Sequence, residues 1–229
     1  MASVTIIIPV KDEEEGLGYL LDEYSSSHFN IDKSFEFIFV IDGRTSDNSR
    51  EIAERFSQRI INQRETHGKG SAIRQAVVEW GKNPSEKVVF LDADGSYSFA
   101  SVLDVISELE AGADVVSGSR FLKESGRPNG MSRLHYFGNR LLSMISGIRN
   151  GKHVSDLCTG LWGFKSSALN GISIQSKGFD LEAELFGWSR KLDMKHEEIP
   201  VEWSQRRGGT SKLRSLRDGF IILLRIIRT

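Results

Sequence analysis

The sequence lacks the features that mark several common classes of protein. Its single cysteine, Cys158, excludes an intrachain disulfide, and no apolar leader follows the first residues, so we expect a cytoplasmic chain. The best candidate for a membrane span, residues 220–227, is shorter than the roughly 18 apolar residues required and contains Arg225. A formal net charge of −1 gives no overall attraction to nucleic acid. The five histidines show no metal-ligand spacing.

What the sequence does contain, through its first half, is an alternation of short apolar runs with helical patterns. The runs are continuous in Val, Ile and Phe, which is typical of strands buried on both faces of a parallel sheet. The chain of 229 residues is long enough for one large domain. We therefore predict a single α/β domain, a mostly parallel sheet flanked by helices. The expected strands are 4–8, 35–41, 59–61 and 88–91, and the expected helices are 14–24, 49–56, 71–80 and 100–110.

The second half is less regular. Residues 114–121 read as a further strand and its loop, and residues 160–164 as a short strand. Helices are expected over 131–145 and from about residue 181. An Arg/Gly-rich loop then leads into an amphipathic helix, so we divide the chain into a domain of residues 1–212 and a C-terminal helix of residues 213–229.

Charged residues follow directly after the predicted strands. In parallel α/β sheets, ligands bind beyond the carboxyl ends of the strands, so these residues are expected to meet at one edge. Two carboxylates one residue apart repel each other, and a Mg²⁺ or Mn²⁺ ion that bridges to a diphosphate would neutralise them. The alternative is a simple strand-end turn with Gly95. The residues after the strands are Pro9, Lys11, Glu13, Asp42, Asp92 and Asp94.

Two other nucleotide-binding patterns are missing. The first strand is followed by PVKDEEEG and not by G-x-G-x-x-G, which disfavours a dinucleotide-binding enzyme. The segment GKGSAIRQA lacks the spacing of a P-loop and precedes the fourth strand. A nucleotidyltransferase remains an alternative, although it would normally have a glycine-rich basic loop after the first strand.

Several segments, in order, resemble the successive signatures of family 2 glycosyltransferases, which have the Rossmann-like GT-A fold. Within that family the chain is similar to the branch of dolichyl- and polyprenyl-phosphate mannose and glucose synthases. The resemblance covers nearly the whole chain, from about residue 4 to residue 219. The segments that carry it are TIIIPVKDEE, VIDGRTSDNS, GKGSAIRQAV, FLDADGS, DVVSGSRF and SDLCTGLWGF.

The resemblance implies a nucleotide-sugar site. The D-x-D motif of Asp92, Ala93 and Asp94 would hold Mg²⁺ or Mn²⁺ on the diphosphate, and Lys69 would lie beside the nucleotide. The base and ribose would be surrounded by Pro9, Lys11, Glu13 and Asp42. Arg44 replaces the usual serine after Asp42, and Ser96 stands where the mannose branch often has glutamine, so the base and sugar stay open.

The acceptor in this branch is a lipid phosphate. A phosphate monoester has a second pKa of about 6, so it is already a nucleophile at neutral pH and needs positive charge to position it, not a base. By the resemblance, Arg120, Arg133, Arg206 and Lys212 hold this phosphate, and Arg120 acts with Asp92 and Asp94 in catalysis. The plain alternative for each arginine is a solvated surface residue.

A hydroxyl acceptor is the main alternative, and it requires a general base. Asp156 or Glu182 would serve, although Asp156 can equally accept backbone N–H bonds and Glu182 lies in the favourable first turn of a helix. A further alternative is a binding module without activity.

The C-terminal segment is rich in basic residues, although the net charge of the whole chain is only −1. It is predicted to form an amphipathic helix. Such a helix can lie in a membrane interface and bring the site to a lipid acceptor, which predicts peripheral attachment at the cytoplasmic face. The alternative is a helix packed on the domain. The interleaved residues are Lys212, Arg214, Arg217, Arg225 and Arg228 with Leu213, Leu216, Phe220, Ile221, Leu224 and Ile227.

Overall fold

One seven-stranded sheet runs through the molecule. The structure, a computed structural model, describes residues 3–26, 35–57, 59–63, 67–122 and 126–229. The strands follow the order β3-β2-β1-β4-β6-β5-β7, and every neighbouring pair is parallel except the two that involve β6. The strands are β1 (Val4–Val10), β2 (Phe35–Asp42), β3 (Ile60–Gln63), β4 (Lys87–Leu91), β5 (Val115–Ser119), β6 (Leu161–Lys165) and β7 (His196–Pro200).

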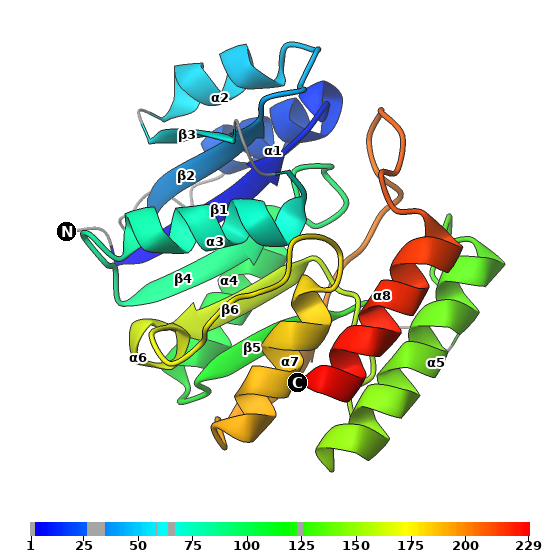
Figure 1. Cartoon of the computed structure of the whole chain (residues 1–229). Coiled ribbons are helices and arrows are strands. Elements are labelled where there is room, and N and C mark those ends of the chain that lie inside the picture. The colour runs from blue at the N-terminus through cyan, green and yellow to red at the C-terminus, as the bar shows by residue number, and fades with distance from the viewer. Residues whose placement is uncertain (1–2, 27–34, 58, 64–66, 123–125) are drawn as a thin grey trace.

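Helices cover both faces of this sheet (Figure 1). α1 and α4 pack in one core with α2 beside α1, whereas α3, α7 and α8 share the other core, and α5 lies beside α8. The helices are α1 (Glu14–Ser26), α2 (Ser49–Phe56), α3 (Lys69–Trp80), α4 (Phe99–Glu110), α5 (Arg133–Asn150), α6 (Ser166–Leu169), α7 (Leu181–Lys191) and α8 (Ser215–Arg228).

The central strand shows why the apolar runs are continuous. Ile6 and Ile8 point into the core with α1 and α4, whereas Ile7 points into the core with α3 and α7. Successive side chains of a strand alternate between faces, and both faces of β1 are buried. The predicted α/β class and mostly parallel sheet are confirmed.

Several features differ from the sequence prediction or were not part of it. The strand β7 was not predicted, because its sequence HEEIP has only one aliphatic residue. Neither was the reversed direction of β6, since composition does not encode strand direction. The last helix begins at Ser215, two residues later than expected. Within the described ranges, no helix combines the length and apolar character needed to cross a membrane.

Candidate functional site

A cavity of about 450 Å³ opens at the carboxyl ends of β1, β2 and β4. Its wall also includes the starts of α3 and α7 and residues of the segment before α8. Arg133 lies exposed at the start of α5 and is not in this wall, whereas His135 is. The candidate residues brought together here are Pro9, Lys11, Glu13, Asp42, Lys69, Asp92, Ala93, Asp94, Arg120, Arg206 and Lys212.

Lys69 bridges two carboxylates at the floor of this cavity. Its Nζ lies 2.6 Å from Oδ1 of Asp92 and 2.6 Å from Oε1 of Glu182. Burial raises the pKa of both carboxyl groups, and Lys69 opposes that effect. Burial alone would lower the pKa of Lys69, but the two carboxylates raise it above its ordinary value. Sequence reasoning did not place Glu182 beside Lys69, because the two lie far apart in the chain.

Two glycines allow Lys69 to reach this position. A Cβ on Gly68 would lie 2.4 Å from the carbonyl oxygen of Lys177, and a Cβ on Gly70 would lie 2.6 Å from that of Ser176. Gly68 also has a φ of +97°, a value that favours glycine. The glycines on either side of Lys69 are therefore explained by a close approach of the backbone at residues 176–178.

The D-x-D turn is fitted just as closely. A Cβ on Gly160 would lie 2.0 Å from Oδ2 of Asp92, so any other residue there would displace that carboxylate. Oδ1 of Asp94 accepts a hydrogen bond from the backbone N–H of Ser96, which orients the second carboxylate. The turn passes through Gly95, whose φ of +68° is left-handed.

The Arg/Gly-rich loop folds back over the acidic edge. Nη2 of Arg206 lies 2.5 Å from Oε2 of Glu13 and 3.8 Å from Oδ2 of Asp94. Burial raises the pKa of Glu13, and Arg206 opposes the shift. Nζ of Lys212 donates to the carbonyl oxygen of Thr210 at 3.1 Å. Arg206 thus stands beside Asp94, one of the predicted metal ligands.

Arg44, which replaces the usual serine, is paired with Asp42. Its Nε and Nη2 donate to the two carboxylate oxygens at 2.9 and 2.7 Å, and Nδ1 of His67 lies 3.2 Å from Oδ1. Burial would raise the pKa of Asp42, but the hydrogen bonds from Arg44 lower it to about 2. Asp42 therefore presents to the cavity a carboxylate that is already paired with Arg44.

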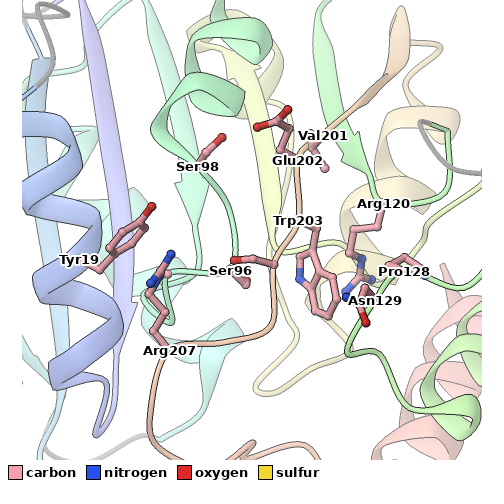
Figure 2. A pocket seen from close by; sticks show the side chains of 12 residues that line it. Tyr19, Ser96, Ser98, Arg120, Pro128, Asn129, Val201, Glu202, Trp203 and Arg207 are labelled. Atoms are coloured by element: carbon pink, nitrogen blue, oxygen red, sulfur yellow. The ribbon is translucent and has the colours of Figure 1, made fainter.

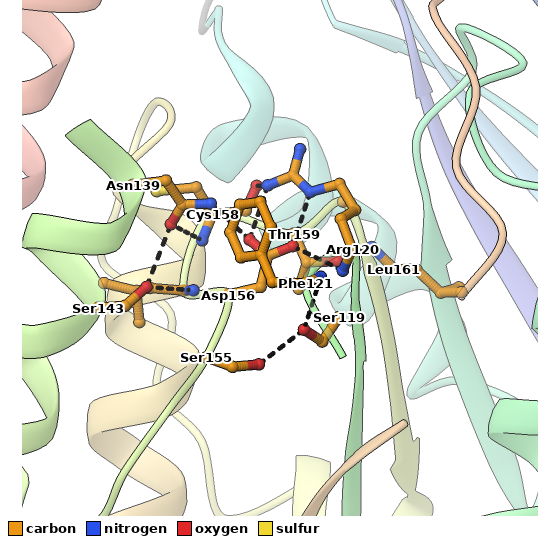
Figure 3. A network of polar contacts seen from close by, with 12 residues as sticks. Ser119, Arg120, Phe121, Asn139, Ser143, Ser155, Asp156, Cys158, Thr159 and Leu161 are labelled. Carbon is orange, nitrogen blue, oxygen red and sulfur yellow. Dashed lines mark hydrogen bonds and ion pairs between the residues drawn. The ribbon is translucent and has the colours of Figure 1, made fainter. Parts of the chain in front are cut away.

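Arg120 is held by the fully buried Asp156 (Figure 3). Its backbone N–H and its Nε donate to Oδ2, at 3.0 and 2.6 Å, and its Nη2 donates to Oδ1 at 2.7 Å. Oδ1 also accepts a hydrogen bond from Nδ2 of Asn139 at 2.5 Å. Nη1 of Arg120 takes part in none of these bonds. Asp156 thus serves to orient Arg120, which agrees with a structural role for this carboxylate.

A second cavity of about 380 Å³ is also lined by Arg120 (Figure 2). Trp203 and Asn129 line it, together with Arg207, whose guanidinium stacks 3.5 Å over the ring of Tyr19. Arg120 lines both cavities, so it stands at the boundary between them.

The paired aspartates fit a hard divalent cation. Within the described part of the chain, no three His, Cys, Asp or Glu side chains converge on a metal position. Mg²⁺ is often held by one or two carboxylates, with substrate phosphates and water supplying the other ligands. Asp92 and Asp94, with space kept for Asp92 by Gly160, match that donor set.

Comparison with known proteins identifies relatives of the whole chain. The family model described as "Glycosyl transferase family 2" matches residues 5–172. Glycosyltransferase AglJ of Haloferax volcanii is 30% identical over 227 residues, which cover 99% of this chain and 71% of that protein. Dolichyl-phosphate beta-glucosyltransferase ALG5A of Trichomonas vaginalis is 26% identical, over 92% of this chain and 68% of the relative.

The fold is shared with solved structures. Glucosyl-3-phosphoglycerate synthase of Mycobacterium tuberculosis in complex with UDP superposes with a TM-score of 0.75 at 16% identity, over 99% of this chain and 79% of that one. The same enzyme with Mn²⁺, UDP-glucose and phosphoglyceric acid gives a TM-score of 0.69. These likenesses establish the GT-A fold that the sequence motifs predicted.

Proposed function

The chain belongs to glycosyl transferase family 2, and from this premise we propose that it moves a hexose from a nucleotide-sugar to a polyprenyl phosphate. The observation that carries the proposal is one cavity with carboxylates and cations side by side. Asp92 and Asp94 suit a metal-bound diphosphate, whereas Arg120, Arg206 and Lys212 suit an anionic acceptor. Relatives named for dolichyl-phosphate hexose transfer support the lipid phosphate.

The donor half of the reaction depends on charge placement. Asp92 and Asp94 would hold Mg²⁺ or Mn²⁺, which neutralises charge on the leaving diphosphate when bound. Lys69 fixes Asp92 at 2.6 Å, so this carboxylate is oriented before the donor arrives. Arg206 adds a positive charge 3.8 Å from Asp94, next to the expected diphosphate. The structures of the synthase with UDP-glucose and Mn²⁺ support a nucleotide-sugar donor.

Attack by a phosphate acceptor requires no general base. An oxygen of the phosphate acceptor attacks the anomeric carbon, the bond from that carbon to the diphosphate oxygen breaks, and a nucleoside diphosphate leaves with inversion. Nη1 of Arg120, outside the bonds to Asp156, is the group we assign to the incoming phosphate. Arg133 lies outside the wall of this cavity, so we give it a weaker claim to that role.

A hydroxyl acceptor is the second candidate, because Glu182 lines the cavity and burial raises its pKa toward that of a base. Release of nucleoside diphosphate separates the two candidates when the acceptor is varied. We expect release with a short polyprenyl phosphate and none above the acceptor-free rate with the matching polyprenol. Stimulation by the alcohol alone would replace the phosphate acceptor with a hydroxyl one.

We also propose that α5 and α8 rest on a membrane surface. The two helices pack together, and α5 carries five apolar residues at alternating spacings of three and four, the pattern of one helix face. Arginines occur along both helices, whose only acidic residue is Asp218, a composition that suits anionic lipid headgroups. The more-than-half-exposed apolar residues are Leu134, Phe137, Leu141, Met144 and Ile148 with Leu216, Phe220 and Ile227.

Sedimentation with lipid vesicles tests this surface. Binding is expected with vesicles that contain phosphatidylglycerol, and replacing Phe137 and Leu141 by serine should abolish it. Val78→Ser, at a residue that is 67% exposed on α3, is the matched control. Equal sedimentation of all three proteins would contradict membrane docking through α5.

A further inference from the structure

One arginine of α8 turns away from the exposed apolar face and into the domain. Nε and Nη2 of Arg225 lie 2.9 and 2.8 Å from Oδ2 of Asp180, and Nη1 lies 3.2 Å from Oε1 of Glu184. The Asp180 and Glu184 side chains are 7% and 2% exposed. Two buried carboxylates at the start of α7 therefore share one cation from α8.

Glu184 connects this cation to the preceding loop. Its carboxylate accepts hydrogen bonds from the backbone N–H of Gln175 at 3.0 Å and from that of Ser176 at 2.8 Å. A carboxylate bonded to the loop on one side and to Arg225 on the other fixes the loop relative to α8. Removal of the cation would leave that carboxylate buried without its charge partner.

The same loop holds the start of α3. The backbone N–H of Gly70 donates to the carbonyl oxygen of Gly178, and that of Ser71 donates to that of Lys177, both at 3.2 Å. Lys69 lies between the two glycines that approach this loop so closely that neither tolerates a Cβ. The position of Lys69, and hence of its partner Asp92, thus depends on the loop.

We propose that Arg225 is a positioning residue for Lys69 and, through it, for the donor site. Arg225 does not itself line the cavity of about 450 Å³, so its effect on that site passes through Asp180 and Glu184, which accept hydrogen bonds from the backbone of residues 175–178, and from that loop to α3. The same contact joins the helix that we place on the membrane to the carboxylate that we assign to the metal. The part of the inference that concerns the donor rests on the proposed function.

Amide hydrogen exchange, measured without any ligand, tests this relay, by which we mean the chain of contacts from Arg225 through the loop at 175–178 to the start of α3. In Arg225→Gln, the amides of Gly70 and Ser71 should exchange at least about tenfold faster than in the wild type. Arg225→Lys, which keeps the charge, should recover part of the protection. Arg59→Gln is the control, because Arg59 has similar exposure and a 2.7 Å ion pair with Glu36, and because its contact with α3, to the carbonyl oxygen of Glu79, lies at the end of that helix away from Gly70 and Ser71. Protection in Arg225→Gln equal to that in the control would overturn the relay.

Calorimetric titration with UDP and GDP in the presence of Mn²⁺ tests the consequence for the donor. Arg225→Gln should weaken binding of the preferred nucleotide about tenfold. In Lys69→Met, adding Arg225→Gln should produce no further loss, because the two residues act in series. Full additivity of the two losses would overturn the positioning role. If the wild type binds neither nucleotide, the proposed function fails, while the exchange result still decides the relay.

Discussion

Replacing Asp156 by asparagine should unfold the protein at a lower temperature as well as lower its activity. Oδ1 of Asp156 accepts hydrogen bonds from Arg120 and Asn139, and Oδ2 accepts two from Arg120. In either orientation, the amide NH₂ of asparagine would face two donors. The substitution also leaves the guanidinium of Arg120, whose side chain is 13% exposed, without its counter-charge.

The expected loss of stability follows from the burial of the ion pair between Asp156 and Arg120. Breaking a buried ion pair by removing one partner costs about 3–5 kcal/mol. For a domain of this size each kcal/mol lowers the melting temperature by about 2–4 °C, so we expect Asp156→Asn to melt about 6–20 °C below the wild type. Asp114→Asn, which removes the partly exposed partner of Lys165, should cost less than about 1 kcal/mol.

Thermal unfolding by circular dichroism, read beside nucleoside diphosphate release, decides the role of Asp156. The account predicts that stability and activity fall together, because both depend on the position of Arg120. An Asp156→Asn protein that melts within about 2 °C of the wild type but has lost more than about a hundredfold in rate would instead show a general base.

Three further results are expected. Gly160→Ala should weaken Mn²⁺-dependent nucleotide binding at least about tenfold by calorimetry, since the new Cβ would lie 2.0 Å from Oδ2 of Asp92; unchanged binding would refute the tight fit. Burial would raise the pKa of Asp42, but Arg44 lowers it to about 2. The ion pair therefore stabilises the fold above about pH 4, and this stabilisation is lost as the pH falls through about 2. Urea titrations of the wild type and Asp42→Asn measure this contribution, which we expect to be about 1–2 kcal/mol because Arg44 is half exposed. The difference in stability between the two proteins should shrink as the pH falls from about 4 to about 2, and a constant difference would refute the pairing. Burial lowers the pKa of His196 to about 3, so the wild type should lose about 2 kcal/mol between pH 6.5 and 5, and His196→Gln should lose less; equal losses would show that His196 charges freely.

The fold was predictable where one residue type is repeated along a strand. The Ile6, Ile7 and Ile8 run requires burial on both faces, which is the condition of a central parallel strand. β7 was missed because its alternation is weak, with Ile199 as its one aliphatic residue. The reversal of β6 depends on which neighbours it pairs with, and that information lies outside the strand.

The candidate site was predictable where its residues are neighbours in the sequence. Asp92 and Asp94 lie one residue apart after a strand, so their shared position followed from the sequence. The contacts that bring Lys69 to Glu182, and Arg225 to Asp180, join residues more than forty positions apart. Such pairs are set by how α3, α7 and α8 pack, so no spacing in the sequence predicts them. The close fit of Gly160 against Asp92 comes from the antiparallel pairing of β4 with β6, which sets Leu91 opposite Leu161.

Transfer of labelled hexose to lipid tests whether this chain uses a polyprenyl phosphate as its acceptor. The purified chain would be incubated with Mn²⁺, each of a set of radiolabelled UDP- and GDP-hexoses and a short polyprenyl phosphate, and the label extracted into organic solvent counted. We expect lipid label with one donor, lost when the metal is chelated or Asp94 is replaced by alanine. A protein that binds nucleotide-sugar with metal but transfers no label to the lipid phosphate from any donor would contradict it.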